Sequence, residues 1–371
     1  MRISKPFSQS HGRVGQPNGT AARLWGVPRV LRFVVPAAAV VLIAGCAQQT
    51  QQRASTGDTP PASTPATAPA IAPAGYACAT ANVFTQPVNA PERQQVTLGD
   101  NTAVLTGTSA SDGVEPSELR GGVLTITQSG RTTVTLPVTA PATSPIVDLF
   151  ILQTQAGHSK VDDETAGSLC LARFSDGAAP VALLALTTGG AHCCFTVRAV
   201  PADGGPAVDH EFGNYAPWFR EVSSGAGQVP VLVSADNAFA FEFASFAGSG
   251  PPVHLFSWSG GGFTDVTRRH LDLVREDAQS YLASYNDPTQ PEKLGFLAGY
   301  LADECVVGDG VSAWRFIDQQ RQLGHLIDPT DPASASAVAG YEPALRQFVV
   351  AHGYCPDDIG QTASQSSSPA E

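Results

Sequence analysis

The spacing of apolar residues changes once along this 371-residue chain, near Thr267, and this change constrains the fold more than any other feature. Residues 76–268 carry short β-branched runs in which apolar and polar side chains alternate, the period of a half-buried strand. Beyond Thr267 apolar residues recur every three or four positions, as at Leu271, Val274 and Ala278, which is the helical period. We therefore predict a mainly β fold with a helical part at its C-terminal end.

The β-rich domain is expected to span residues 76–268. Phe239, Phe241 and Phe243 alternate with other residues, which predicts a strand whose aromatic face lies in the core. Glycine-containing turns between β-branched runs predict two hairpins, and three further runs predict single strands. These segments are 123–127 with 132–138 around Ser129-Gly130, 253–258 with 263–267 around the loop 259–262, and 146–152, 181–186 and 229–233.

A faint internal repeat lies within this domain. Residues 172–184 align with residues 220–232, and each copy is predicted as a strand, a tight glycine turn, a buried strand and an outer hairpin. A repeat of roughly 40–50 residues is typical of propeller blades. Two copies cannot close a propeller, so an open or irregular assembly of blades and a β-sandwich both remain as architectures.

Three segments of the chain resemble a family of poorly characterised secreted bacterial proteins with degenerate FG-GAP or VCBS-type blades. They are Thr188-Gly-Gly-Ala-His-Cys-Cys-Phe195, Ser234–Phe241 and Gly262–Arg269, and the resemblance covers roughly residues 165–355. It implies an architecture and says little about activity. FG-GAP blades often carry calcium loops, but the matching loops at 174–177 and 222–225 keep at most one aspartate. Since calcium prefers six to eight oxygen ligands, we expect neither calcium nor another cofactor.

The helical subdomain is expected to span residues 269–358. Helices are predicted at 292–306, 311–323 and 332–352, and Gly353 has the position of a C-terminal cap. Cys305 and Cys355 both lie in this subdomain, so we prefer a disulfide between them.

The N-terminal segment has the pattern of a bacterial lipoprotein signal. Six basic and no acidic residues precede an apolar run at 33–43, and Ile43-Ala-Gly-Cys46 resembles the lipobox. We expect cleavage after residue 45 and lipid, including palmitate, on Cys46, which would hold the protein on the outer face of the cell membrane. Residues 46–75 are predicted as a disordered tether, and 359–371 as a disordered tail.

The charge of the mature chain limits its partners. Cleavage removes six of 21 basic residues and none of the 33 acidic ones, which leaves a formal charge of −18. Such a surface argues against nucleic acid as a ligand. The membrane is therefore expected to be reached through the lipid, and an envelope protein or a glycan is the expected ligand.

The remaining six cysteines suggest disulfides, because the number is even and the protein is exported. Cys193 and Cys194 are either a vicinal pair, which would leave Cys78 to bond Cys170, or they bond Cys78 and Cys170 separately. A third interpretation is a soft-metal or redox site at His192, Cys193 and Cys194. We favour disulfides, because adjacent strand residues point to opposite faces and no second Cys/His pair has zinc-like spacing.

Signatures of known hydrolases and of phosphate-binding loops are missing from the sequence. The first hypothesis is therefore a lipid-anchored extracytoplasmic binding or structural protein without catalysis. The second is a cell-envelope hydrolase with an unfamiliar acidic site, built from residues such as Asp209, His210 and Asp236. A deep pocket that joins two carboxylates would favour the hydrolase, and a shallow, repeat-built face would favour binding.

Overall fold

The computed structural model of the protein describes residues 75–79, 91–109, 118–141, 148–150, 152–154, 168–190, 193–225, 227–326 and 334–360. All of them belong to one compact unit, Pro69–Glu371. The predicted signal, Cys46, most of the tether and nearly all of the tail lie outside these residues. Within the described ranges, no helix is both long and apolar enough to cross a membrane.

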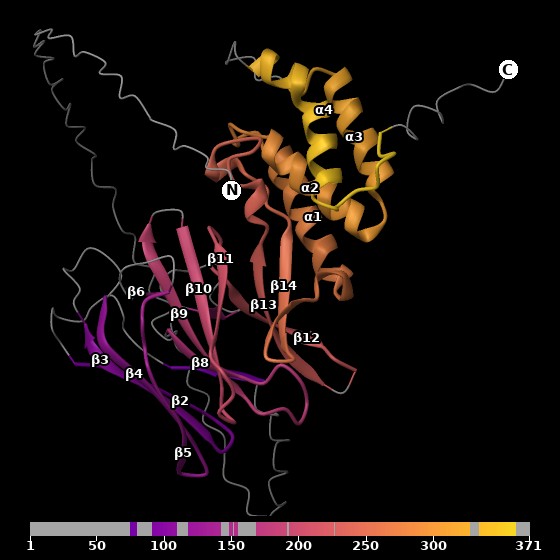
Figure 1. Cartoon of the computed structure of the whole chain (residues 1–371). Helices are drawn as coiled ribbons and strands as arrows, with labels where there is room; N and C mark the ends of the chain where they lie inside the picture. The colour runs from indigo at the N-terminus through magenta and orange to yellow at the C-terminus, as the bar shows by residue number, and fades with distance from the viewer. Residues whose placement is uncertain are drawn as a thin grey trace, which may run out of the picture. The chain divides into compact units, whose positions relative to one another are not determined.

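The first of three sheets in the described part of the chain is a four-stranded antiparallel meander (Figure 1, indigo to purple). The predicted hairpin around Ser129-Gly130 is confirmed, since both residues have positive φ, 48° and 79°, in the tight turn between two strands. The strands are β2 (Pro91–Leu98), β3 (Asn101–Ser109), β4 (Leu119–Gln128) and β5 (Arg131–Pro137).

The second and third sheets contain the two copies of the repeat. The second has the order β1-β8-β9-β10-β11, with β6 also paired to β9, and the third has the order β15-β14-β13-β12-β7. The strands are β1 (Tyr76–Cys78), β6 (Asp148–Leu149), β7 (Gln153–Thr154), β8 (Leu169–Ala172), β9 (Val181–Gly190), β10 (Cys193–Pro201), β11 (Val208–Gly213), β12 (Trp218–Ser223), β13 (Gln228–Ala235), β14 (Val253–Ser259) and β15 (Gly262–Asp265).

The repeat thus corresponds to two antiparallel meanders, β8 to β11 and β12 to β15, which lie in different sheets. Each copy of the aligned sequence covers the first hairpin of its meander. Neither sheet closes into a barrel. The fold class, mainly β with a C-terminal helical part, is confirmed, whereas membership of the FG-GAP family stays a prediction.

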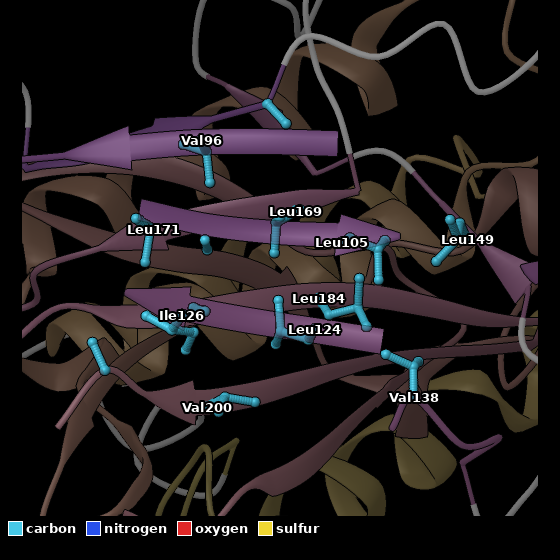
Figure 2. Packing of buried hydrophobic residues seen from close by; sticks show 14 of the residues in the cluster. Val96, Leu105, Leu124, Ile126, Val138, Leu149, Leu169, Leu171, Leu184 and Val200 are labelled. Atoms are coloured by element: carbon cyan, nitrogen blue, oxygen red, sulfur yellow. The ribbon is translucent and has the colours of Figure 1, made fainter. Parts of the chain in front are cut away.

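The sheets stack because each alternates its apolar side chains between two faces. Leu105, Leu124 and Ile126 of the first sheet pack against Leu169 and Leu184 of the second, as Figure 2 shows. The opposite face of the second sheet packs against the third sheet through Leu183, Val197, Phe219 and Leu232. These contacts are the sheet-on-sheet packing of a sandwich, the second of the two architectures expected.

The segment 146–152 was predicted as one buried strand, and the described part of it is shorter. Only Asp148–Leu149 is a strand, but the burial is as expected. Leu149 belongs to the core between the first and second sheets, while Phe150 and Leu152 belong to the core between the second and third.

The prediction of a strand over Phe239–Phe243 is wrong. The Asp236 side chain accepts a hydrogen bond from the Ala238 amide and begins a 3-10 turn at Asn237–Phe239 (η2), which ends the extended backbone of β13. Phe239 is buried, but Phe241 has a φ of 63° and is 56% exposed. The phenylalanines at every second position therefore lie in a turn and not in a strand, so their side chains do not share one face.

In the part of the chain that the structure describes, four helices follow the third sheet: α1 (Leu271–Asn286), α2 (Leu294–Val307), α3 (Gly310–Gln322) and α4 (Ser334–Ala351) (Figure 1, orange to yellow). Gly308 ends α2 in the left-handed conformation with a φ of 99°, which an L-residue rarely adopts. The inward residues Leu297, Leu301, Ile317, Leu345 and Val349 form one helical core. Leu273 of α1 packs against Val231 and Val233, on the outer face of the third sheet.

Two disulfides have both partners among the described side chains. Cys78 bonds Cys170, its direct neighbour across β1 and β8, and Cys305 bonds Cys355, the pairing preferred from the sequence. Cys194 is also disulfide-bonded.

Candidate functional site

Two carboxyl groups form a pair between the helices α1 and α2. Asp277 on α1 is partly exposed, whereas Asp303 on α2 is only 1% exposed. Asp303 keeps a proton and donates a hydrogen bond to Asp277, and the Val253 amide donates to Asp277 Oδ2 at 3.0 Å. Burial is the largest cause that raises the pKa of Asp277 to about 6 and the pKa of Asp303 well above its usual range. Within the described ranges neither carboxyl group forms an ion pair with a lysine or arginine.

The Val253 amide reaches Asp277 because the loop before β14 lies directly on α2. A Cβ atom at Gly299 would lie 2.2 Å from the Gly250 carbonyl oxygen, so only glycine allows this approach. Tyr281 of α1 donates a hydrogen bond to the Pro251 carbonyl oxygen at 2.6 Å. The loop is therefore held between both helices that carry the carboxyl pair.

Gly299→Ala is expected to lower the free energy of unfolding by about 2 kcal/mol, because the added methyl group must displace backbone atoms of the loop. Urea unfolding would measure the loss. Gly340→Ala is the matched control, since Gly340 lies in α4 with open space around its Cα, and it should stabilise the protein by about 0.5–1 kcal/mol. If both variants changed the free energy of unfolding equally, the close approach of the Gly250 loop to α2 would be contradicted.

A second polar cluster lies beside the carboxyl pair. Tyr354, after α4, donates a hydrogen bond to Asp236 Oδ2 at 2.8 Å, and its hydroxyl lies 3.0 Å from His254 Nε2. Burial, followed by the negative charge of Asp236, raises the pKa of Tyr354. A cavity of about 350 Å³ adjoins this cluster, and its wall includes Asp236, His254, Asp265, Asp303, His352 and Tyr354.

A second cavity, of about 660 Å³, has several aromatic residues in its wall, and we call it the aromatic pocket. The rings of Tyr215 and Phe246 stack with their centroids 5.4 Å apart. Burial, followed by the negative charge of Asp236, raises the pKa of Tyr215 to about 12. Asp277 is part of the wall. The aromatic lining residues are Phe195, Tyr215, Trp218, Phe246 and Tyr281.

The aromatic pocket joins elements that are distant in the chain. Trp218 lies at the start of β12, Phe246 lies in the loop before β14, and Tyr281 lies on α1. At the rim Arg220 of β12 forms an ion pair with Glu276 of α1 at 2.7 Å. The pocket is therefore built between α1 and the third sheet, and strands of the second repeat copy form part of its wall.

The acidic site expected from the sequence does not form around its three named residues. Asp209 binds Arg198 through two hydrogen bonds of 2.6 Å, and His210 packs between Phe212 and Phe256. Both belong to β11 of the second sheet, whereas Asp236 follows β13 of the third. Burial lowers the pKa of His210, which favours its neutral form.

The cysteine motif has one described side chain. Cys194 is disulfide-bonded, so it is not available as a thiolate ligand, and its amide donates a hydrogen bond to Thr188 Oγ1 at 2.7 Å. His192 and the side chain of Cys193 lie outside the described residues. The vicinal bond between Cys193 and Cys194 stays a prediction.

Of the three acidic-site candidates, only Asp236 lies in a cavity wall, and the Asp277–Asp303 pair and Tyr354 were not identified from the sequence because their partners are far away in the chain. One signal was available. Asp277 lies three positions after Val274, and Asp303 seven after Phe296, so both fall on the spacing of buried residues in their helices. A carboxylate at such a position is unusual and indicates a functional or strongly hydrogen-bonded site.

Comparisons with known proteins match the helical part of the chain to a family described as the sll0997 C-terminal domain, over residues 274–353. This range contains both members of the carboxyl pair. No solved structure matches the chain.

Two curated relatives are similar over about half of this chain. The probable thylakoid lumen protein sll0997 of Synechocystis sp. is 30% identical over 196 residues, which cover 48% of this chain and 58% of that protein. The uncharacterized protein y4bJ of Sinorhizobium fredii is 22% identical over 197 residues, 49% of this chain and 31% of that protein. The chain thus spans less than two thirds of either relative. The similarity to a lumen protein and the disulfides together indicate an extracytoplasmic protein.

Proposed function

We propose that this protein is a non-catalytic binding protein of the cell envelope, that lipid on Cys46 anchors it, and that its ligand occupies the aromatic pocket. The pocket carries the proposal. Its volume of about 660 Å³ lies within the range of small-molecule sites, about 300–1,000 Å³, and its aromatic walls are typical of such sites.

The groups around the aromatic pocket fit binding better than catalysis. Among the described residues of its wall there is no histidine, lysine or cysteine that could activate a nucleophile. Ser234 donates its hydroxyl proton to the Tyr215 carbonyl oxygen at 2.7 Å, which holds that side chain in a structural role. The aromatic residues that line the pocket can instead supply a large contact area to a ligand.

A cell-envelope hydrolase is the second candidate, and the smaller cavity favours it, because carboxyl groups of Asp236, Asp265 and Asp303 lie in one wall with His254. Two carboxyl groups of different pKa can divide acid and base roles. Binding remains the better-supported function, since the Asp236 side chain already accepts hydrogen bonds from Tyr354 and from the Ala238 amide.

Native mass spectrometry of the protein extracted from producing membranes would test the proposal. We expect lipid mass on Cys46 and a small molecule bound one to one. In the double variant Trp218→Ala and Phe246→Ala we expect retained lipid and at least about tenfold lower occupancy, since buried aromatic anchors dominate binding. Trp258→Ala is the matched control, because Trp258 packs on Phe263 outside the pocket. Equal occupancy in both variants would reject the pocket, and an unmodified Cys46 would reject the anchor.

A further inference from the structure

We propose that the aromatic pocket binds an organic cation, with the ammonium group held between the aromatic rings and the Asp277 carboxylate. The inference rests on the proposed binding function and names the chemical class of the ligand. It follows from the charges of the wall, the nature of the rings and the proton held by the carboxyl pair.

Among the described residues, the pocket wall has a carboxyl group that forms no ion pair. Among the described residues of the wall, Arg220 is the one basic residue, and it is already paired with Glu276. Asp277 has no ion pair in the described part of the chain, and Asp303 lies behind it as a second acid. Buried carboxyl groups are rare unless a cation or a metal compensates them. A cationic ligand would supply the missing charge.

The rings of the pocket suit a cation better than an anion or a purely apolar ligand. The face of a tyrosine, tryptophan or phenylalanine ring attracts an ammonium group, and several such rings together recognise quaternary ammonium ligands. The Tyr281 hydroxyl is fixed by its hydrogen bond to the Pro251 carbonyl oxygen, so the ring keeps its orientation beside Asp277. Tyr215 and Phe246 form a stacked pair in the same wall.

The proton on the carboxyl pair explains how the site exists without its ligand. The hydrogen bond from Asp303 to Asp277 reduces the negative charge of the pair to one, as expected when no cation is present. A bound ammonium group would favour the ionised form of the pair and lower its pKa. Affinity for a permanently charged cation should therefore rise with pH around the pKa of Asp277, which is about 6.

The ammonium group could be carried by a small amine or by an amino sugar of an envelope glycan, and both present the same chemistry to the pocket. Titration calorimetry of the full mature protein at a pH of about 7.5 would use two matched pairs of probes. The first pair is choline and its neutral carbon analogue, dimethylbutanol. The second pair is glucosamine and N-acetylglucosamine.

We expect choline to bind at least about tenfold more tightly than its neutral analogue. Asp277→Asn should remove this preference, while the amide oxygen can still accept the Val253 hydrogen bond. Asp272→Asn is the matched control, since Asp272 is exposed on the same helix, and it should keep the preference. Urea midpoints of both variants would show that they are folded.

Each outcome decides a separate part. Equal affinity for choline and its neutral analogue in the wild-type protein would overturn the cation site but leave the aromatic pocket as a binding site. If none of the four probes binds the wild-type protein, the proposal of a cation site in the aromatic pocket is overturned. Stronger binding of glucosamine than of choline, with N-acetylglucosamine weak, would support the cation site and assign the ammonium group to a sugar.

Discussion

Replacing Cys305 and Cys355 by alanine is expected to lower the free energy of unfolding by about 4 kcal/mol. The bridge joins two cysteines that are 50 residues apart. In the chain-entropy model, a bridge that closes a loop of this length lowers the entropy of the unfolded chain, which stabilises the folded state by about 4 kcal/mol. The bridge also ties the end of α2 to the segment after α4. Urea unfolding of the oxidised wild type and of the double variant would measure the difference.

The loss should have a local consequence at the second polar cluster. Cys355 follows Tyr354, whose hydroxyl bonds Asp236 and lies beside His254. Without the bridge, we expect faster hydrogen exchange in this segment than in β13. Alanine at both Cys78 and Cys170 is the matched control, because that bridge spans 92 residues and should also cost about 4–5 kcal/mol without loosening Tyr354. A loss below about 1 kcal/mol for the first pair would contradict the expectation.

The sequence was sufficient for features that depend on neighbours in the chain. Both hairpins, the change to helices beyond Thr267 and the four inward helical faces follow from local periodicity, because a strand or helix must bury one face. The repeat also identified two meanders of equal topology. It could not say that a separate meander, β2 to β5, would cover one of them, since stacking of sheets depends on contacts between distant segments.

The candidate site could not be predicted in the same way. Asp236 and Tyr354 are 118 residues apart, and Asp277 meets Asp303 only because two helices pack around one loop. From the sequence, Asp209 and His210 were the candidates. In the structure Asp209 forms an ion pair with an arginine, and His210 packs against aromatic rings. Sequence patterns identify polar residues that are adjacent in the chain. The site depends instead on tertiary contacts and on glycines that allow the loop before β14 to lie directly on α2.

The carboxyl pair should make the protein less stable as the pH rises. Asp277 has a pKa of about 6 in the folded state against 3.8 for its ordinary value, so between these values the folded state binds more protons than the unfolded state. The stabilisation is therefore complete below the unfolded pKa and is lost as the pH rises through the folded pKa. The full loss from Asp277 is about 3 kcal/mol, and Asp303, whose pKa is raised further, extends it to higher pH.

The double variant Asp277→Asn and Asp303→Asn isolates this effect, because asparagine keeps the shape and cannot ionise. At a pH of about 8 we expect the variant to be more stable than the wild type, and at a pH of about 4 the advantage should be gone, since the wild-type pair is then protonated. Urea unfolding across this range measures the difference. Asp272→Asn, on the exposed face of α1, is the matched control and should not become more stable than the wild type at a pH of about 8. A difference between wild type and double variant that stays constant with pH would mean that the pair is ionised throughout. In that case a shared proton would not explain how Asp277 and Asp303 lie side by side without a cation.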